Sequence, residues 1–126
     1  MKSIIITPII LLLCGCSPFV PTRNIADVPK EQLSEAYKVR TATLDNPIPQ
    51  SIISKYVENI TAYSCQFYPS DPPASKGDAL LQLKLKALEK GADAIIDLTF
   101  DTRGTDPFGT NCWESVQASG VAVKLK

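Results

Sequence analysis

The N-terminal leader most constrains what this chain can fold into, because it separates a removable segment from the part that can form a domain. A basic Lys2 precedes an apolar stretch at residues 4–13, a pattern typical of a cleaved secretory signal. A membrane-spanning helix needs roughly 20 apolar residues, whereas this stretch contains Pro8 and soon meets Gly15. We therefore predict that residues 1–15 are a signal peptide, which leaves room for one small domain.

The leader ends in the sequence Leu-Leu-Leu-Cys-Gly-Cys, residues 11–16. This run resembles the lipobox of bacterial lipoproteins, which implies cleavage before Cys16 and attachment of a diacylglyceryl group, with chains such as palmitate, to its thiol. One acyl chain holds a protein only marginally, at about 0.8 kcal/mol per buried CH₂, but the three chains expected here would attach it permanently. The same resemblance implies that Ser17 directs the protein to the outer membrane, with its domain in the periplasm. The alternative is an ordinary cleaved signal followed by a chance cysteine.

The four cysteines could form two disulfides, but the leader accounts for two of them. Cys14 would leave with the signal peptide and Cys16 would be acylated. Cys65 and Cys112 remain, in a chain that would mature in the oxidising periplasm, where disulfides persist. We predict that these two form a bridge. It would close a loop of about 48 residues and stabilise the fold by about 4 kcal/mol.

Composition argues against several classes of function. The 13 basic and 13 acidic residues balance, and no stretch concentrates Lys or Arg with interleaved aromatic residues, so we expect no nucleic-acid partner. The chain has no histidine, no G-x-S-x-G motif and no thiol left free once the bridge forms. We therefore expect no enzyme and no cofactor, although a Ser-Lys or carboxylate mechanism stays open.

Asp93, Asp97 and Asp101 share one face of a predicted strand and could suggest a cation site. Sites for hard cations need six or more oxygen ligands in a cage, and no second acidic cluster joins these three residues. We interpret them as a solvated face and predict no metal site.

The chain after Cys16 divides at about residue 37. Residues 17–29 contain three prolines and show no sustained period, which is typical of a flexible tether, although residues 31–37 could add one or two helical turns. We predict a lipidated N-terminus and tether at 16–36 and a domain at 37–126. Within the domain we predict strands at 39–44, 56–63, 93–101 and 115–125, a turn at 45–49, and loops at 66–73 and 103–111.

A helix between residues 75 and 91 is the clearest predicted element. Ser75 and Asp78 resemble a capping box, and Gly91 supplies the C-terminal stop. Lys84 falls inside the apolar arc, so either its stem snorkels or the buried stripe is narrower than the arc. The arc consists of Leu80, Leu81, Leu85, Ala87 and Leu88.

The strand after this helix has alternating apolar residues, namely Ala94, Ile96, Leu98 and Phe100. This alternation predicts one apolar face that packs on the helix. Strands before and after one helix, in so short a chain, indicate an α+β fold. We predict a small sheet of about four strands with one helix packed on a face and one disulfide.

The order and spacing of several segments carry a family resemblance. The segments are Ser64-Cys65-Gln66, the proline-rich turn after it, the helix ending in Lys90-Gly91-Ala92-Asp93-Ala94-Ile95-Ile96, and Cys112-Trp113 followed by Gly120-Val121-Ala122-Val123. From about residue 39 to the C-terminus, this arrangement resembles the RcsF family. The resemblance implies an outer-membrane lipoprotein that senses envelope stress and signals by contact to an inner-membrane regulator of the IgaA type in the Rcs phosphorelay. It also implies partnership with the barrel-assembly machinery and with outer-membrane β-barrel proteins.

Two departures from that family matter. The second disulfide of the family has no counterpart here, and the positions that correspond to it are Thr99 and Ala118. The family's tether is also longer, more basic and denser in proline than residues 17–29. We therefore do not expect this tether to thread through a barrel to the cell surface.

The aromatic residues beside the two cysteines are the candidate partner surface. Phe67 and Tyr68 follow Cys65, and Trp113 follows Cys112. Aromatic anchors dominate many protein interfaces, so these side chains could bind a partner; alternatively, they pack over the disulfide.

A different class of function is also open. The segment at residues 92–96, after a leucine-rich helix, resembles small YbjQ-like domains that form oligomers. That resemblance implies a ligand-binding or structural envelope lipoprotein with no signalling role.

Overall fold

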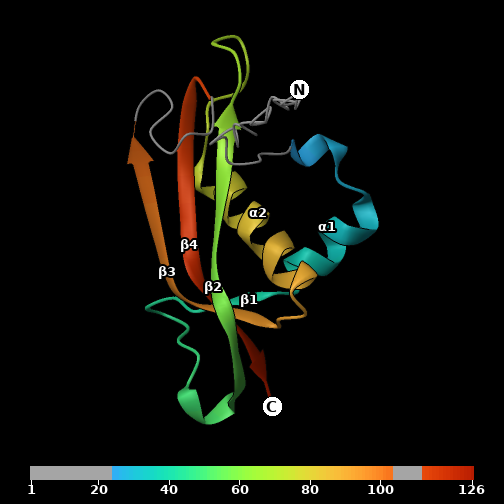
Figure 1. Ribbon diagram of the computed structural model, residues 1–126, viewed down its shortest axis with the longest axis vertical. Coiled ribbons are helices and arrows are strands. Elements are labelled where there is room, and N and C mark those ends of the chain that lie inside the picture. Colours follow the sequence, from blue (N-terminus) through green and yellow to red (C-terminus); the bar gives the residue numbers. More distant parts are fainter. Residues whose placement is uncertain (1–23, 104–111) are drawn as a thin grey trace, which may run out of the picture.

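The computed structural model describes residues 24–103 and 112–126. Within these residues, four strands form one mixed sheet in the order β1-β3-β4-β2, with β1 parallel to β3 and the other pairs antiparallel (Figure 1). The predicted α+β fold, with a four-stranded sheet and one disulfide in this part of the chain, is confirmed. The elements are η1 (Ile25–Asp27), α1 (Lys30–Tyr37), β1 (Arg40–Thr41), η2 (Gln50–Ile52), β2 (Ile53–Gln66), α2 (Lys76–Glu89), β3 (Ala94–Arg103) and β4 (Glu114–Leu125).

Strands β2 and β4 run along the longest axis of the molecule (Figure 1). Their pairing extends from Ile53 opposite Leu125 to Gln66 opposite Glu114, so both strands are longer than predicted. With a rise of about 3.3 Å per residue, the 14 residues of β2 span about 43 Å. We call the end with Gln66 and Glu114 the disulfide end, and the end with η2 and Leu125 the η2 end.

Helix α2 begins and ends at the predicted residues. The Ser75 hydroxyl accepts a hydrogen bond from the backbone N–H of Asp78 (3.1 Å), which confirms the N-cap. At the other end Gly91 has a φ of 73°, and the N–H of Ala92 donates to the carbonyl of Ala87 (2.9 Å). This closing turn needs a left-handed residue, a conformation that glycine adopts without steric cost.

The buried surface of α2 is wider than the predicted arc, because the helix packs on two sides. One side lies on the sheet through Ala79, Leu83 and Ala87, and Leu83 is fully buried although the predicted arc omits it. The other side contacts α1 through Leu81 and Leu85. A helix held between a sheet and a second helix is covered over more of its circumference than a helix with one apolar stripe.

Helix α1 lies on the outer side of α2 and extends the ordered domain toward the N-terminus. Ala36 of α1 and Val28 before it are buried against Leu85 of α2. The predicted tether runs to residue 36, but η1 and most of α1 lie within its last part, and α1 matches the helical turns allowed for residues 31–37. The segment from η1 to α1 docks because its small and aliphatic residues pack against the second apolar side of α2. Among the described residues, no helix is both long and apolar enough to cross a membrane.

Lys84 of α2 is half-buried, and desolvation by its surroundings lowers its pKa from the ordinary value of 10.5. We expect Lys84→Met to raise the free energy of unfolding by no more than about 1 kcal/mol at neutral pH, because methionine fills the same space without a charge. The free-energy cost of partly burying the charged Lys84 ammonium is fully present below the pKa of Lys84 in the folded protein. It is relieved as pH rises toward 10.5, so the advantage of the variant should shrink over that range.

Urea denaturation of wild type and variant at neutral and alkaline pH would test this expectation. The same substitution at the exposed Lys30 is the control and should change little. An advantage of Lys84→Met that stays constant with pH would contradict the role of desolvation.

Strand β3 contains a bulge at Asp97. Its register with β4 shifts between Ile96 and Thr99, and Asp97 has a positive φ of 52°. Aspartate tolerates this left-handed conformation better than most residues. One extra residue in a strand moves every following side chain to the other face of the sheet.

The bulge corrects the predicted alternation of β3. Before the bulge, Ile95 packs in the core under α2, whereas Ala94 and Ile96 belong to a separate cluster on the opposite face. After the bulge, Leu98 and Phe100 pack against the core under α2. The prediction that all four alternating apolar residues share the face toward the helix was therefore wrong.

The same shift affects the positions assigned to the family's second disulfide. Ala118 pairs with Phe100, and both contribute to the core under α2. Thr99 instead pairs with Ser119 and is exposed. Because neighbouring residues of a strand point to opposite faces, Thr99 and Ala118 could not be joined by a bridge. The pair that a cross-strand bridge could join is Phe100 and Ala118.

Strand β1 is shorter than the strand predicted at residues 39–44. Only Arg40–Thr41 pairs with β3. The N–H of Asn46 then donates to the hydroxyl of Thr43 (3.0 Å), which turns the chain away from the sheet edge. Ile48 packs on the sheet face opposite α2, so the segment between β1 and β2 covers part of that face.

Strand β2 lies at one edge of the sheet, where α2 contacts it. The ammonium of Lys86 donates to the backbone carbonyl of Thr61 (2.8 Å), and Lys90 forms an ion pair with Glu58 (2.9 Å). The register of β2 is also irregular between Ile53 and Glu58. Lysine side chains and bulges at an edge discourage pairing with another chain.

Candidate interaction surface at the disulfide end

The disulfide joins the end of β2 to the residue that shortly precedes β4. Cys65 and Cys112 are bonded, with their Cα atoms 5.5 Å apart and a sequence separation of 47, which confirms the predicted pairing. Cys112 is buried. The N–H of Trp113 donates to the carbonyl of Gln66 (2.7 Å), so the backbone pairing continues beyond the bridge.

The loop between β2 and α2 is held by its own hydrogen bonds. Gln66 is buried, and its side-chain amide donates to the carbonyl of Asp71 (2.9 Å). The Asp71 carboxylate accepts from the N–H of Tyr68 (3.1 Å), and the N–H of Asp71 donates to the carbonyl of Tyr68 (3.0 Å). These bonds fix the backbone at Phe67 and Tyr68.

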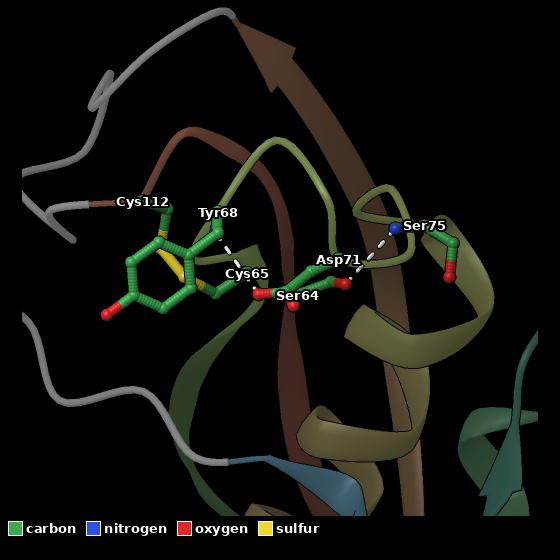
Figure 2. Close-up of a disulfide and its surroundings, with 6 residues drawn as sticks. All are labelled: Ser64, Cys65, Tyr68, Asp71, Ser75 and Cys112. Carbon is green, nitrogen blue, oxygen red and sulfur yellow. Dashed lines mark hydrogen bonds between the residues drawn. A yellow bond between two sulfur atoms is a disulfide. The ribbon is translucent and has the colours of Figure 1, made fainter.

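A second set of bonds attaches the start of α2 to the sheet. The hydroxyl of Ser64, which is buried on β2, accepts from the N–H of Ser75 (3.1 Å), the N-cap residue of α2. Figure 2 shows this contact and the contact between Tyr68 and Asp71 beside the Cys65–Cys112 bridge. The bridge, the loop and the helix start therefore form one rigid end of the domain.

Three aromatic side chains predicted as a partner surface are exposed at this end. The exposed fraction is 43% for Phe67, 68% for Tyr68 and 54% for Trp113. The hydrogen bond between Trp113 and Gln66 places Trp113 next to the strand end that leads into Phe67. Apolar groups that are exposed together on a rigid surface typically mark a site of interaction.

A cleft of about 320 Å³ opens beside these residues. It is lined by Cys65 and Phe67, by Asp71 of the loop, and by Asn24 and Ile25 of the first described turn. Residues 24 and 25 were predicted as part of the tether, so their position beside this cleft was missed. The Asn24 side chain accepts from the N–H of Ala26 (2.9 Å), but this local bond carries no signal for the distant cleft.

A larger cleft of about 560 Å³ lies toward the η2 end, between the segment after β1 and the sheet. Leu44 and Tyr56 on its rim are exposed. Asp97 of the bulge also lines it. This cleft was not predicted, because the bulge at Asp97 that lines it was not foreseen.

The three acidic residues of the β3 segment have different surroundings. The Asp93 carboxylate accepts from the N–H of Leu125 (3.0 Å), and Asp97 lies at the bulge. Asp101 is half-buried. In residues 24–103 and 112–126, no group of three or more His, Cys, Asp or Glu side chains is placed to hold a metal ion. Cys16, the predicted lipidation site, lies outside the described residues.

No protein-family model matches the chain, and no curated protein matches it.

Proposed function

We propose that this protein is an RcsF-like outer-membrane lipoprotein that senses envelope stress and signals by contact. In this proposal Cys16 carries the acyl chains, and the domain lies in the periplasm. Its partners are an inner-membrane regulator of the IgaA type, the barrel-assembly machinery and outer-membrane β-barrel proteins. The protein acts without catalysis and without a cofactor.

The observation that carries the proposal is the division of the four cysteines. A lipobox-like run accounts for Cys14 and Cys16, and the other two cysteines are joined in a disulfide. This division fits a chain that is exported, acylated and oxidised. The signalling role depends further on the resemblance in the order of the bridge, the capped helix and the final strands.

The hydrogen-bonded disulfide end supports a role in binding. A surface that is already ordered before binding loses less conformational entropy when it docks on a protein or a membrane. The bridge and the loop bonds of Gln66 and Asp71 supply that order for Phe67 and Tyr68.

Complementation would test the signalling proposal. The full-length chain is expressed in a Gram-negative strain that lacks its own sensor of this type and carries a transcriptional reporter of the phosphorelay. We expect an agent that damages the outer membrane to induce the reporter several-fold, and Cys16→Ala, which cannot be acylated, to lose the stress response. An accumulated, acylated wild-type protein that leaves the reporter silent would refute the signalling role.

A structural, oligomeric lipoprotein remains the second candidate. Beyond its short pairing with β1, the outer edge of β3 has no strand partner among the described residues. An open strand edge can pair with another copy of the chain. Light scattering of the acylated protein in a defined detergent, corrected for bound detergent, separates the candidates: a stable pentamer favours the structural role and a monomer favours signalling.

A further inference from the structure

The point where the described chain begins is fixed relative to the disulfide end. Asn24 and Ile25 line the same cleft as Cys65 and Phe67. Val28, which follows η1, is buried in the contact between α1 and α2. The segment from η1 to α1 is therefore held on the domain, and it begins beside the bridge.

The length of chain between Cys16 and Asn24 limits where this point can lie. Asn24 is eight residues after Cys16, and eight fully extended residues reach about 29 Å at most. If Cys16 is acylated as proposed above, Asn24 must lie within that distance of the lipid to which the acyl chains are attached.

This limit excludes an inverted orientation of the domain. With the η2 end against the membrane and the disulfide end outermost, Asn24 would lie about one β2 length from the lipid, about 43 Å. The chain from Cys16 cannot reach that far. The inverted orientation is therefore excluded, and the disulfide end lies within about 29 Å of the membrane that anchors the protein.

The surface at this end suits a lipid interface. Trp and Tyr side chains concentrate at the boundary between lipid and water, where an amphipathic ring contacts both. Trp113, Tyr68 and Phe67 are all exposed here. They follow the two bridged cysteines, so the disulfide holds the two chain segments together at this surface.

The charges at this end indicate which lipid surface would be bound. Its described charged side chains include acidic Asp71, Asp78 and Glu114, whereas basic Lys76 lies over the ring of Phe100 (5.7 Å from the centroid). These three acidic side chains are not attracted to anionic lipids. The rings, rather than a basic patch, would provide the contact with a zwitterionic lipid surface.

We propose that Phe67, Tyr68 and Trp113 rest in the interface of the membrane that carries the acyl chains of Cys16. The long axis of the domain then points away from that membrane, and the η2 end, with Leu44 and Tyr56, faces the periplasmic interior. This inference rests on the proposed acylation but not on the signalling role.

Trp113 reports on this contact directly, because it is the only tryptophan in the chain. Acylated full-length mature protein is reconstituted in phosphatidylcholine vesicles, and mass spectrometry first confirms the acyl chains. We expect Trp113 emission at shorter wavelength than in non-acylated Cys16→Ala in solution, several-fold weaker quenching by aqueous acrylamide, and strong quenching by brominated phosphatidylcholine. Added salt should change none of these signals appreciably.

Two variants of the acylated protein locate the contact. Phe67→Ser with Tyr68→Ser should restore much of the acrylamide quenching of Trp113. Tyr56→Ser, which removes an exposed aromatic at the η2 end, is the matched control and should leave the signal unchanged. The circular dichroism of each variant shows whether it is folded.

The possible failures are distinguishable. Mature protein without acyl chains would overturn both the anchor and this inference. Acylated protein whose Trp113 stays accessible to acrylamide in vesicles would overturn the membrane contact and leave the signalling proposal standing. Shielding of Trp113 that requires an added envelope protein would instead assign the aromatic surface to a protein partner and would also overturn the membrane contact.

Discussion

Replacing Cys65 and Cys112 together by alanine is expected to lower the free energy of unfolding by about 4 kcal/mol. The bridge closes a loop with a sequence separation of 47, and without it the unfolded chain gains the conformational freedom of that loop. Small domains have total stabilities of about 5–15 kcal/mol, so the variant should be close to the limit of folding. The bridge also holds the start of β4 beside the end of β2.

Urea denaturation, monitored by far-ultraviolet circular dichroism, measures this effect. The unfolding midpoint reports the loss of stability if the dependence of the unfolding free energy on urea is the same for both proteins. Wild type with a strong reductant should unfold near the midpoint of the double variant, whereas the same reductant should not affect the variant. Midpoints that coincide for oxidised wild type and double variant would contradict the stabilising role of the bridge.

Gly120→Ala should lower the free energy of unfolding by about 2–3 kcal/mol, although it adds only one methyl group. A Cβ atom at Gly120 would lie 2.5 Å from Cγ2 of Ile95 and 3.0 Å from the backbone carbonyl oxygen of Ile96. Ile95 is fully buried, and its branched side chain has few alternative rotamers. Relief would require the central strands β3 and β4 to move apart where they contact α2.

Gly77→Ala is the matched control, because it makes the same substitution in an open position. Apart from the chain neighbours and the backbone of the helix itself, no described atom lies within 4 Å of a Cβ at Gly77 in the first turn of α2. This variant should gain up to about 1 kcal/mol, since alanine favours the helix more than glycine does. Urea midpoints that move in opposite directions would support the packing explanation, and equal midpoints for Gly120→Ala and wild type would refute it.

Much of the fold could be predicted, because its strongest signals come from single residues or from the small number of cysteines left to form a bridge. The Ser75 cap and the Gly91 stop are set by the chemistry of single residues, and both are confirmed. The Cys65–Cys112 pairing followed from the fate expected for the other two cysteines, and it is also confirmed.

The errors arise where tertiary contacts decide the outcome. Asp97 looks like an ordinary polar position in an alternating strand, and only the pairing of β3 with β4 reveals the bulge that reverses the faces. Residues 24–36 lack a strong local period, so their docking depends on the second apolar side of α2 at Leu85. Fully buried Leu83 was missed for a related reason, because the helix contacts neighbours on two sides.

The candidate surface was only partly visible in the sequence. Adjacency to the two cysteines indicated Phe67, Tyr68 and Trp113, and the structure places all three at one end with substantial exposure. The position of Asn24 beside the cleft at that end could not be predicted, because the cleft joins residues far apart in the chain. If Cys16 is acylated as proposed, that position limits how the domain can stand on a membrane.

The hydrogen bond from Lys86 to the carbonyl of Thr61 has a consequence for the crowding of such a protein. In the proposed anchored state, neighbouring copies share one orientation and diffuse in two dimensions, so their edge strands meet far more often than in dilute solution. A long regular edge on β2 would then template lateral strand pairing between copies. Lys86 and the irregular register of β2 act against such pairing, so anchored copies that meet at this edge would be less prone to join their sheets through β2.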